Sequence, residues 1–340
     1  MSSERTLTLA RAGREAVIWE MENNPEVFMI GQDIVGTGGV FRTAEGLAKR
    51  FGRDRIVESP ISETGVIGLA TGAAMAGMRP LVEMAYIDFI GVCFNALANF
   101  AAKTHYMSGG QYSVPMVLVA GTGGGYSNAA QHSQCLYSLL AHMPGMKIVV
   151  PSNAYDAKGL MHSAIRDDNP VVFLYAKAVA GLGFLGKPHP RAMMAVPEEP
   201  YVVQFGKARI SREGSDITLV GLGYTSVLAL DAADLLMQDD ISAEVVDLRS
   251  LVPLDRESIC ASVAKTGRLV VADEDYGSYG VSAEVLAAVA EKIPSALRAP
   301  ARRVTFPDIS IPFARQMEYH VLPSAQTIAD AARAVVRGGE

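Results

Sequence analysis

The sequence is poor in cysteine, in tryptophan and in concentrated positive charge. Its 340 residues include three cysteines and one tryptophan, and the cysteines, Cys93, Cys135 and Cys260, lie far apart among apolar neighbours. An odd number of scattered cysteines indicates buried free thiols rather than a disulfide framework or a metal cluster. No run of Lys or Arg is long enough to follow a phosphate backbone, and the net charge is -6. A general nucleic-acid binder is therefore not expected.

Long apolar runs are also missing. No uninterrupted stretch approaches the roughly 20 residues that a membrane-spanning helix needs, and the start, Met1-Ser2-Ser3-Glu4-Arg5, lacks the pattern of a signal peptide. We therefore expect a cytoplasmic protein that does not bind membranes. Because 49% of the residues are hydrophobic and only 19% are charged, the composition favours association with another subunit.

In the first half of the chain, short apolar or β-branched runs alternate with segments whose apolar residues recur near the helical period of 3.6. Such alternation predicts a doubly wound α/β domain with a mostly parallel sheet. The expected strands are 27–30, 55–58, 80–85, 116–120, 147–150 and 171–175, and the expected helices are 9–21, 43–51, 64–77, 89–106, 133–142 and 155–166.

A second, smaller α/β domain is predicted after a break. Glycines and prolines between residues 180 and 201 indicate a linker without regular elements. The predicted domains are therefore 1–180 and 205–340, joined by a linker at 181–204. The alternation resumes with expected strands at 217–220, 243–246, 268–272 and 302–305 and expected helices at 226–237, 256–265, 282–293 and 325–337.

Glu63 follows Pro60-Ile61-Ser62 and begins a glycine-rich helical segment. Gly68 and Gly72, four residues apart, remove side chains from one helix face, although each glycine costs roughly 1 kcal/mol relative to alanine. Close packing or function must therefore outweigh helix propensity here. Two roles fit Glu63. It is either a carboxylate that reaches a bound group, or a first-turn acid that favours the helix dipole behind an N-cap at Ser62.

His132 lies in the polar run Gln131-His132-Ser133-Gln134, after a glycine-rich loop. A ring that titrates near neutrality can exchange protons with a substrate there, although most single histidines have structural roles. His105, His142, His162, His189 and His320 have no comparable polar setting, and their spacing indicates no metal site.

Two glycine-rich segments resemble nucleotide-binding loops without meeting their requirements. Gly121-Thr122-Gly123-Gly124-Gly125 lacks the Lys-Ser/Thr pair that ends a P-loop, so we expect it to shape the surroundings of His132. Gly221-Leu222-Gly223 precedes a helix in the second half, but Ser226 replaces the third glycine of the dinucleotide motif. Nicotinamide binding is therefore disfavoured.

A series of short motifs occurs in one order along nearly the whole chain. Together they resemble the β subunits of thiamine-diphosphate-dependent 2-oxo acid dehydrogenases, in the transketolase superfamily. Pyruvate and acetoin dehydrogenases are the most similar types, and the pair Asp273-Glu274 favours the acetoin type. The motifs are Pro60-Ile61-Ser62-Glu63, Gly72-Ala73-Ala74-Met75-Ala76-Gly77, Ala101-Ala102-Lys103, Met107-Ser108-Gly109-Gly110, Ala130-Gln131-His132-Ser133-Gln134, Pro144-Gly145-Met146-Lys147, Asp156-Ala157-Lys158-Gly159-Leu160, Val246-Asp247-Leu248-Arg249, Pro253-Leu254-Asp255 and Lys265-Thr266-Gly267-Arg268.

The resemblance implies a transketolase-like pyrimidine-binding domain followed by a transketolase C-terminal-like domain. Glu63 matches the carboxylate that hydrogen-bonds the cofactor pyrimidine and promotes its imino tautomer. Ile61 and Phe89 match cofactor neighbours, although Phe89 also fits a core position. His132 matches the active-site histidine. The resemblance further implies a structural potassium ion held largely by backbone oxygens around Ala164, Ile165, Asp167 and Asn169.

The resemblance also implies that the chain holds half of an active site. The Gly-Asp-Gly motif that binds Mg²⁺ and diphosphate in this family does not occur in the sequence. An α subunit is therefore expected to supply it, in an α2β2 assembly that passes an acyl group to a lipoyl-bearing acyltransferase. A split transketolase, which moves two-carbon ketol units between sugars, would use the same half-site. A non-catalytic partner subunit is disfavoured because Glu63 and His132 are both present.

Two departures leave the substrate open among 2-oxo acids, acetoin and ketoses. Tyr175-Ala176-Lys177 replaces the Glu-x-Lys that is usual in the family, and Gly31-Gln32-Asp33 replaces Gly-Glu-Asp. Glu63 and His132 are unaffected, so thiamine chemistry is predicted more firmly than any one substrate.

Overall fold

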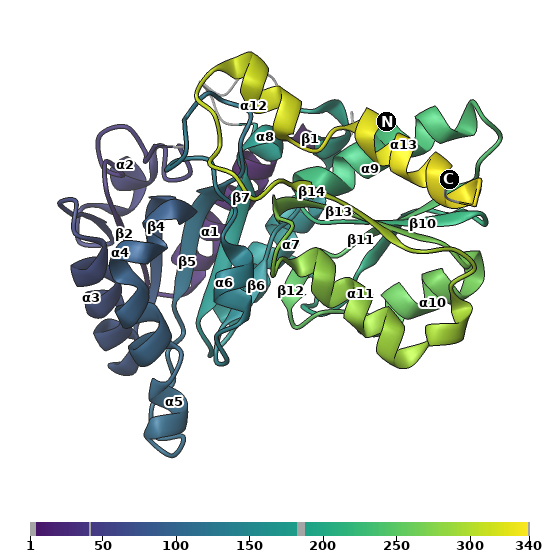
Figure 1. The fold of residues 1–340 in the computed structure, drawn as a ribbon. Helices are drawn as coiled ribbons and strands as arrows, with labels where there is room; N and C mark the ends of the chain where they lie inside the picture. Colours follow the sequence, from purple (N-terminus) through teal and green to yellow (C-terminus); the bar gives the residue numbers. More distant parts are fainter. Residues whose placement is uncertain (1–4, 41, 182–187, 339–340) are drawn as a thin grey trace. The chain divides into compact units, whose positions relative to one another are not determined.

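The computed structural model describes residues 5–40, 42–181 and 188–338. The chain divides into two compact units: unit 1 comprises Met1–Thr122 and Leu139–Phe205, and unit 2 comprises Gly123–Ser138 and Gly206–Glu340 (Figure 1). Each is an α/β unit with a mostly parallel sheet, which confirms the predicted fold class. Segment 123–138 belongs to unit 2, although its sequence neighbours on both sides belong to unit 1.

The strands of unit 1 lie in the order β6-β7-β5-β4-β2-β3 and pair in parallel. Most are continuous buried apolar runs, as expected for strands covered on both faces. The strands are β2 (Val27–Gly31), β3 (Ile56–Glu58), β4 (Arg79–Tyr86), β5 (Val117–Thr122), β6 (Lys147–Val149) and β7 (Val171–Ala176).

The helices of unit 1 cover both faces of this sheet. From β3 to β6 the chain moves along the sheet in one direction, and from β6 to β7 it moves back. Because parallel crossovers are right-handed, helix α7 lies on the face opposite to α3 and α4. Helix α1 packs on α7, and α3 packs beside α4 (Figure 1). The helices are α1 (Leu9–Asn23), α2 (Leu47–Phe51), α3 (Glu63–Met75), α4 (Ile90–Asn95), α5 (Thr104–Met107), α6 (Tyr137–Ala141), which begins in unit 2, α7 (Ala154–Arg166) and α8 (Lys177–Ala180).

Unit 2 contains a five-stranded sheet in the order β14-β13-β10-β11-β9, in which only β9 pairs antiparallel among the described strands. Helices α9 and α13 pack together on one face and α10 and α11 on the other (Figure 1). The elements are β9 (Arg209–Arg212), β10 (Ile217–Gly221), α9 (Tyr224–Met237), β11 (Ala243–Asp247), β12 (Ser250–Val252), α10 (Arg256–Thr266), β13 (Leu269–Tyr276), α11 (Val281–Lys292), β14 (Arg302–Phe306), α12 (Arg315–Val321) and α13 (Ala325–Val336).

One long predicted helix is interrupted. Instead of one helix over 89–106, the structure has a 3-10 turn, Ile87–Phe89, then α4, a π-helical segment, Ala96–Ala101, and α5. The amide of Ala102 donates to the carbonyl of Leu97, five residues back, at 3.0 Å. Apolar periodicity predicts a helix but does not distinguish α from π hydrogen bonding.

Two other predicted helices begin late. Expected helix 43–51 starts at Leu47, because Thr43 donates to Glu83 and Gly46 adopts a left-handed conformation with φ of 80°. Expected helix 133–142 starts at Tyr137, immediately after Leu136, whose φ is 49°. Both helices start later than predicted because of residues with positive φ or long-range hydrogen bonds. The spacing of apolar residues in the sequence indicates neither feature.

The predicted absence of regular structure between residues 180 and 201 is wrong for residues 190–195. A 3-10 turn occupies Pro190–Ala192, and β8 (Met194–Ala195) pairs antiparallel with β1 (Thr6–Leu7). Gly183 and Gly186, which supported the linker prediction, lie outside the described residues.

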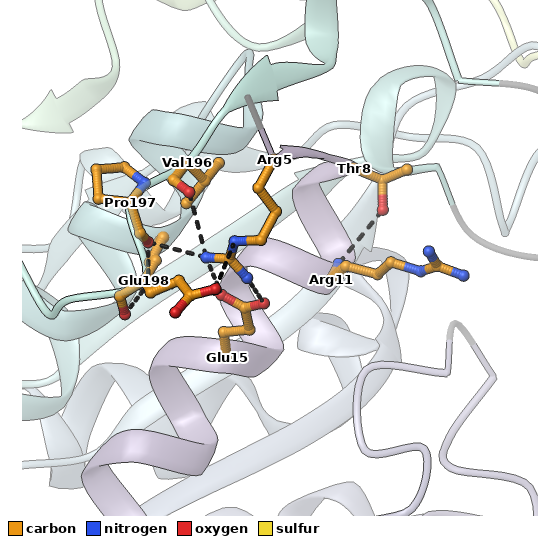
Figure 2. A network of polar contacts seen from close by, with 8 residues as sticks. Arg5, Thr8, Arg11, Glu15, Val196, Pro197 and Glu198 are labelled. Atoms are coloured by element: carbon orange, nitrogen blue, oxygen red, sulfur yellow. Dashed lines mark hydrogen bonds and ion pairs between the residues drawn. The ribbon is translucent and has the colours of Figure 1, made fainter. Parts of the chain in front are cut away.

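Figure 2 shows the polar contacts that order the end of this segment. The guanidinium of Arg5 pairs with Glu15 and donates to the carbonyl of Pro197 at 3.0 Å. Lys158, which is buried, donates to the carbonyls of Pro197 at 2.6 Å and Glu198 at 2.9 Å. Two cations thus satisfy successive backbone oxygens and hold residues 196–198 on unit 1.

Candidate active site

Glu63 is the first residue of α3 and lines a narrow cavity in unit 1. The cavity lies where β2, β3 and β4 approach their carboxyl ends, the usual location of binding sites in parallel sheets. Its free volume is about 10 Å³, enough for a single water molecule. The other lining residues are Gln32, Ser59, Val66, Ile67, Val82, Glu83 and Met84.

Gln32 is a polar neighbour of Glu63 in the wall of this cavity. Its amide Nε2 lies 3.5 Å from Oε1 of Glu63, at the outer limit of a hydrogen bond. Gln32 follows β2, at the position where the sequence resemblance leads us to expect Glu. A neutral amide therefore faces the Glu63 carboxylate where a second acid would repel it.

Glu83 is a second carboxyl group in the wall of the cavity. It lies in the middle of β4 and is buried, and burial raises its pKa to about 8, although a hydrogen bond from Thr43 opposes the shift. Its Oε1 and the Oγ of Ser59 have no hydrogen-bond partner among the described residues. Sequence reasoning missed Glu83, although a lone acid within an apolar strand is an unusual signal.

The N-terminus of α3 is open. Ser62 occupies the N-cap position, but its side chain makes no capping hydrogen bond, so the structure does not support that role. Gly68 and Gly72 are exposed, and a Cβ atom added at either position would meet no atom within 4 Å. The face of α3 that carries these glycines is thus free to receive another surface.

Ile61 and Phe89 have different settings in unit 1. Ile61 is 82% exposed, two residues before Glu63. Phe89 is half-buried and meets the ring of Tyr86 edge-on, with 6.2 Å between centroids. The packing of Phe89 is equally suited to a core residue, and its predicted cofactor contact stays a prediction.

His132 belongs to unit 2, in the loop between β5 and α6, and is half-buried. The structure thus groups Glu63 with Gln32 and Glu83 in unit 1 and places His132 in the other unit. The catalytic roles predicted for Glu63 and His132 stay predictions.

The glycine loop before His132 is occupied by carboxylates of the protein itself. The amide of Gly124 donates to Glu274, and the amides of Gly125 and Ser127 donate to Glu318, each at 2.8 Å. Successive amides of this kind form an anion-binding concavity. Here its anions are side chains, so the loop offers these amides to no phosphate.

The residues proposed to hold potassium already have partners. The guanidinium of Arg79 donates to the carbonyls of Ile165 at 2.9 Å and Asp167 at 3.2 Å. The Asp167 carboxylate pairs with Lys147 and accepts from the amide of Asn169 at 2.9 Å. Ala164 is buried in the last turn of α7. Among the described residues, no group of three or more His, Cys, Asp or Glu side chains has the arrangement of a metal site.

The structure also shows the surroundings of three further features noted in the sequence: Tyr175, the partial dinucleotide motif and His162. Tyr175 is buried on β7, and its hydroxyl occupies the space where a Cβ of Gly13 would lie. In the partial dinucleotide motif, Asp247 is buried and accepts from the hydroxyl of Ser226 at 2.9 Å. The prediction that the other histidines have no comparable polar setting is wrong for His162, because its buried Nδ1 lies 2.6 Å from Oε1 of Glu20.

No described helix is both long and apolar enough to cross a membrane.

The chain matches two domain families in succession. The transketolase pyrimidine-binding domain matches residues 5–181, and the transketolase C-terminal domain matches residues 206–328. Among solved structures, a chain described as "split gene transketolase, inactive beta4 tetramer" superposes with a TM-score of 0.76. It covers 98% of this chain and 99% of its own length, but the sequence identity of 23% supports the fold alone.

Curated relatives are similar over almost the full length. The β subunit of acetoin:2,6-dichlorophenolindophenol oxidoreductase from Cupriavidus necator is 42% identical, with 99% of each chain covered. The β subunit of the pyruvate dehydrogenase E1 component from Bacillus subtilis is 39% identical over 97% of this chain and 98% of its own. The 2-oxoisovalerate dehydrogenase β subunit from Bacillus subtilis is 40% identical over 92% and 94%. The chain therefore belongs to the transketolase-like family of β subunits of thiamine-diphosphate-dependent 2-oxo acid and acetoin dehydrogenases.

Proposed function

We propose that the chain is the β subunit of the decarboxylating component of a 2-oxo acid or acetoin dehydrogenase. In this proposal it forms half of the active site and, with an α subunit, passes an acyl group to a lipoyl carrier. The observation that carries the proposal is the position of Glu63. Its carboxylate lies at the open N-terminus of a glycine-faced helix, beside a cavity with unpartnered polar atoms.

The residues around Glu63 fit the pyrimidine end of thiamine diphosphate. Glu63, the first residue of α3, and the exposed Ile61 would hold this end of the cofactor. When bound, the cofactor supplies a thiazolium carbon that loses a proton and attacks a carbonyl group. Phe89 would contact the ring.

The two proposed catalytic residues act at different atoms. Glu63 would hold a proton at the pyrimidine ring nitrogen and so favour the imino form that accepts the thiazolium proton. Gln32 would orient the Glu63 carboxylate without adding a negative charge. His132 would exchange a proton with an oxygen of the substrate.

The Mg²⁺- and diphosphate-binding motif that this sequence lacks indicates which kind of partner subunit the chain needs. The chain contains no Gly-Asp-Gly motif, so we assign the binding of Mg²⁺ and diphosphate to an α subunit in an α2β2 assembly. The two curated dehydrogenases and the oxidoreductase described above are themselves named as β subunits. The open glycine face of α3 is a suitable surface for a second chain to approach closely.

Potassium binding belongs to the same proposal. The carbonyls of Ile165 and Asp167 each accept one hydrogen bond from Arg79, and a carbonyl oxygen has a second lone pair. Replacing NaCl by KCl at constant ionic strength should then raise the melting temperature. Equal melting temperatures in the two salts would count against the site.

A split transketolase is the second candidate. A solved structure with that description shares the fold at a TM-score of 0.76. Sequence identity near 40% to the dehydrogenase and oxidoreductase subunits, against 23% to the transketolase chain, favours the first candidate. Screening the complex with its α chain against pyruvate, 2-oxoisovalerate, acetoin and ketose phosphates would separate the two.

The decisive test is Glu63→Gln in the complex with the α chain. Glutamine keeps the size of the side chain but lacks the carboxylate, so assembly should persist while hydrogen–deuterium exchange at the thiazolium carbon slows by about 10²- to 10⁴-fold. His132→Ala should leave that exchange unchanged and reduce turnover. Wild-type exchange in an intact Glu63→Gln complex would show that Glu63 is only a helix-end carboxylate.

A further inference from the structure

The loop that carries His132 is held at its beginning by two carboxylates of unit 2. Glu274, on β13, accepts from the amide of Gly124, and Glu318, on α12, accepts from Gly125 with Oε1 and from Ser127 with Oε2. Glu318 is fully buried. A carboxylate that bridges two amides fixes their relative orientation, and hydrogen bonds to a charged acceptor are stronger than neutral ones.

The end of the same loop is held by the neighbours of Glu274 on β13. The hydroxyl of Tyr137 donates to Asp273 at 2.5 Å, and the hydroxyl of Ser138 donates to Asp275 at 2.8 Å. Both aspartates are buried. Three consecutive acids at the end of one strand, together with Glu318, thus fasten both ends of residues 123–138. We refer to Asp273, Glu274, Asp275 and Glu318 as the acid clamp.

The loop needs such anchoring because its backbone is unfavourable. Non-glycine residues avoid positive φ, and each one held there must be supported by its surroundings. A Cβ at Gly123 would lie 2.6 Å from Oε1 of Glu274, so the close approach also requires glycine. The positive φ values are 90° at Gly123, 94° at Gly125, 54° at Ser127, 60° at Ala129 and 49° at Leu136.

We infer that the acid clamp positions His132: its four carboxylates select one conformation of the loop, and the C-terminal unit thereby determines where this histidine is presented. This inference rests on the proposed role of His132 in turnover. It also explains why segment 123–138 belongs to unit 2, although the strand before it and the chain after it belong to unit 1. The clamp residues are positioning residues, since their observed contacts are to the loop and to unit 2.

The first test needs only the full chain and no cofactor. In Glu318→Gln, one oxygen can still accept a hydrogen bond but the new amide group faces a backbone N–H. Hydrogen–deuterium exchange of residues 124–127 should then accelerate about tenfold or more, as expected from the loss of one charged hydrogen bond. Tyr137→Phe, which removes the donor to Asp273, should accelerate exchange at the other end. The matched control is Glu257→Gln, an exposed acid on α10. Wild-type exchange in both Glu318→Gln and Tyr137→Phe would overturn the inference.

The second test uses the complex with the α chain. Glu318→Gln should leave exchange at the thiazolium carbon within about twofold of wild type and reduce turnover about tenfold, because it disturbs the His132 step alone. The double variant Glu318→Gln/His132→Ala should be no slower than His132→Ala, because the two residues act on one step. Additive losses would overturn the positioning role. If Glu318→Gln accelerates exchange in the loop but His132→Ala keeps full turnover, the role of His132 is refuted, and the positioning inference with it. Glu63→Gln would still test the thiamine chemistry separately.

Discussion

At the scale of single residues, Glu83 shows how burial controls the charge of a carboxyl group. It sits inside an apolar strand, and burial raises its pKa from the ordinary 4.5 to about 8. Below pH 4.5 the group is protonated in both the folded and the unfolded chain. Between about pH 4.5 and 8 the unfolded chain releases the proton and the folded chain keeps it, so the free energy of unfolding falls by about 1.4 kcal/mol per pH unit.

Glu83→Gln should remove this pH-dependent loss. The glutamine carbonyl can still accept from Thr43, so the variant should resemble wild type at pH 4 and become progressively more stable than wild type up to pH 8. Urea unfolding at intervals across this range measures the difference. A difference that does not change with pH would mean that Glu83 is ionised in the folded chain.

At the scale of elements, Gly13 allows α1 to pack against β7. A Cβ atom at this position would lie 1.9 Å from the hydroxyl oxygen of Tyr175. Gly13→Ala should therefore destabilise the chain by about 1–3 kcal/mol, although alanine is the better helix former. Tyr175→Phe in the same chain should restore most of the loss, and thermal or urea unfolding of the two single variants and the double variant measures the coupling. Independent, additive effects would contradict the contact.

In helix α3, unlike at Gly13, a side chain added at Gly72 would have free space. A Cβ at Gly72 would meet no atom within 4 Å, so Gly72→Ala should stabilise the isolated chain by up to about 1 kcal/mol. If the glycine face receives the α subunit, the same methyl group should weaken association with that subunit by about tenfold, measured by sedimentation or calorimetry. Unchanged association would place the contact with the α subunit on another surface.

At the scale of the whole molecule, the chain is predicted to be incomplete as a cofactor-binding protein. Without a Gly-Asp-Gly motif, the isolated chain should show no micromolar binding of thiamine diphosphate with Mg²⁺ in calorimetry, and adding the α chain should restore it. A tight one-to-one site on the isolated chain would refute the shared site. NAD should not raise the melting temperature, because Asp247 is buried against Ser226.

Local sequence patterns were sufficient for the alternation of strands and helices and for the place of Glu63 at a helix start. Buried parallel strands are continuous apolar runs and helices repeat every 3.6 residues, so each can be recognised from a few neighbours. The same local signals missed the π-helical segment, the antiparallel edge strand β9 and helix α12. They also suggested a Ser62 cap that the structure does not form.

Only the tertiary structure decided which distant groups meet. Gln32 lies beside Glu63 because β2 and β3 are neighbours in the sheet. The loop at Gly124 and Gly125 meets Glu274 and Glu318, which are 150 and 193 residues away in the sequence. The sequence by itself determined most of the strands and helices, the family and the candidate catalytic residues, because these depend on local periodicity and short motifs. The partners of those residues depend on strand order and on where each crossover returns, which no local pattern encodes.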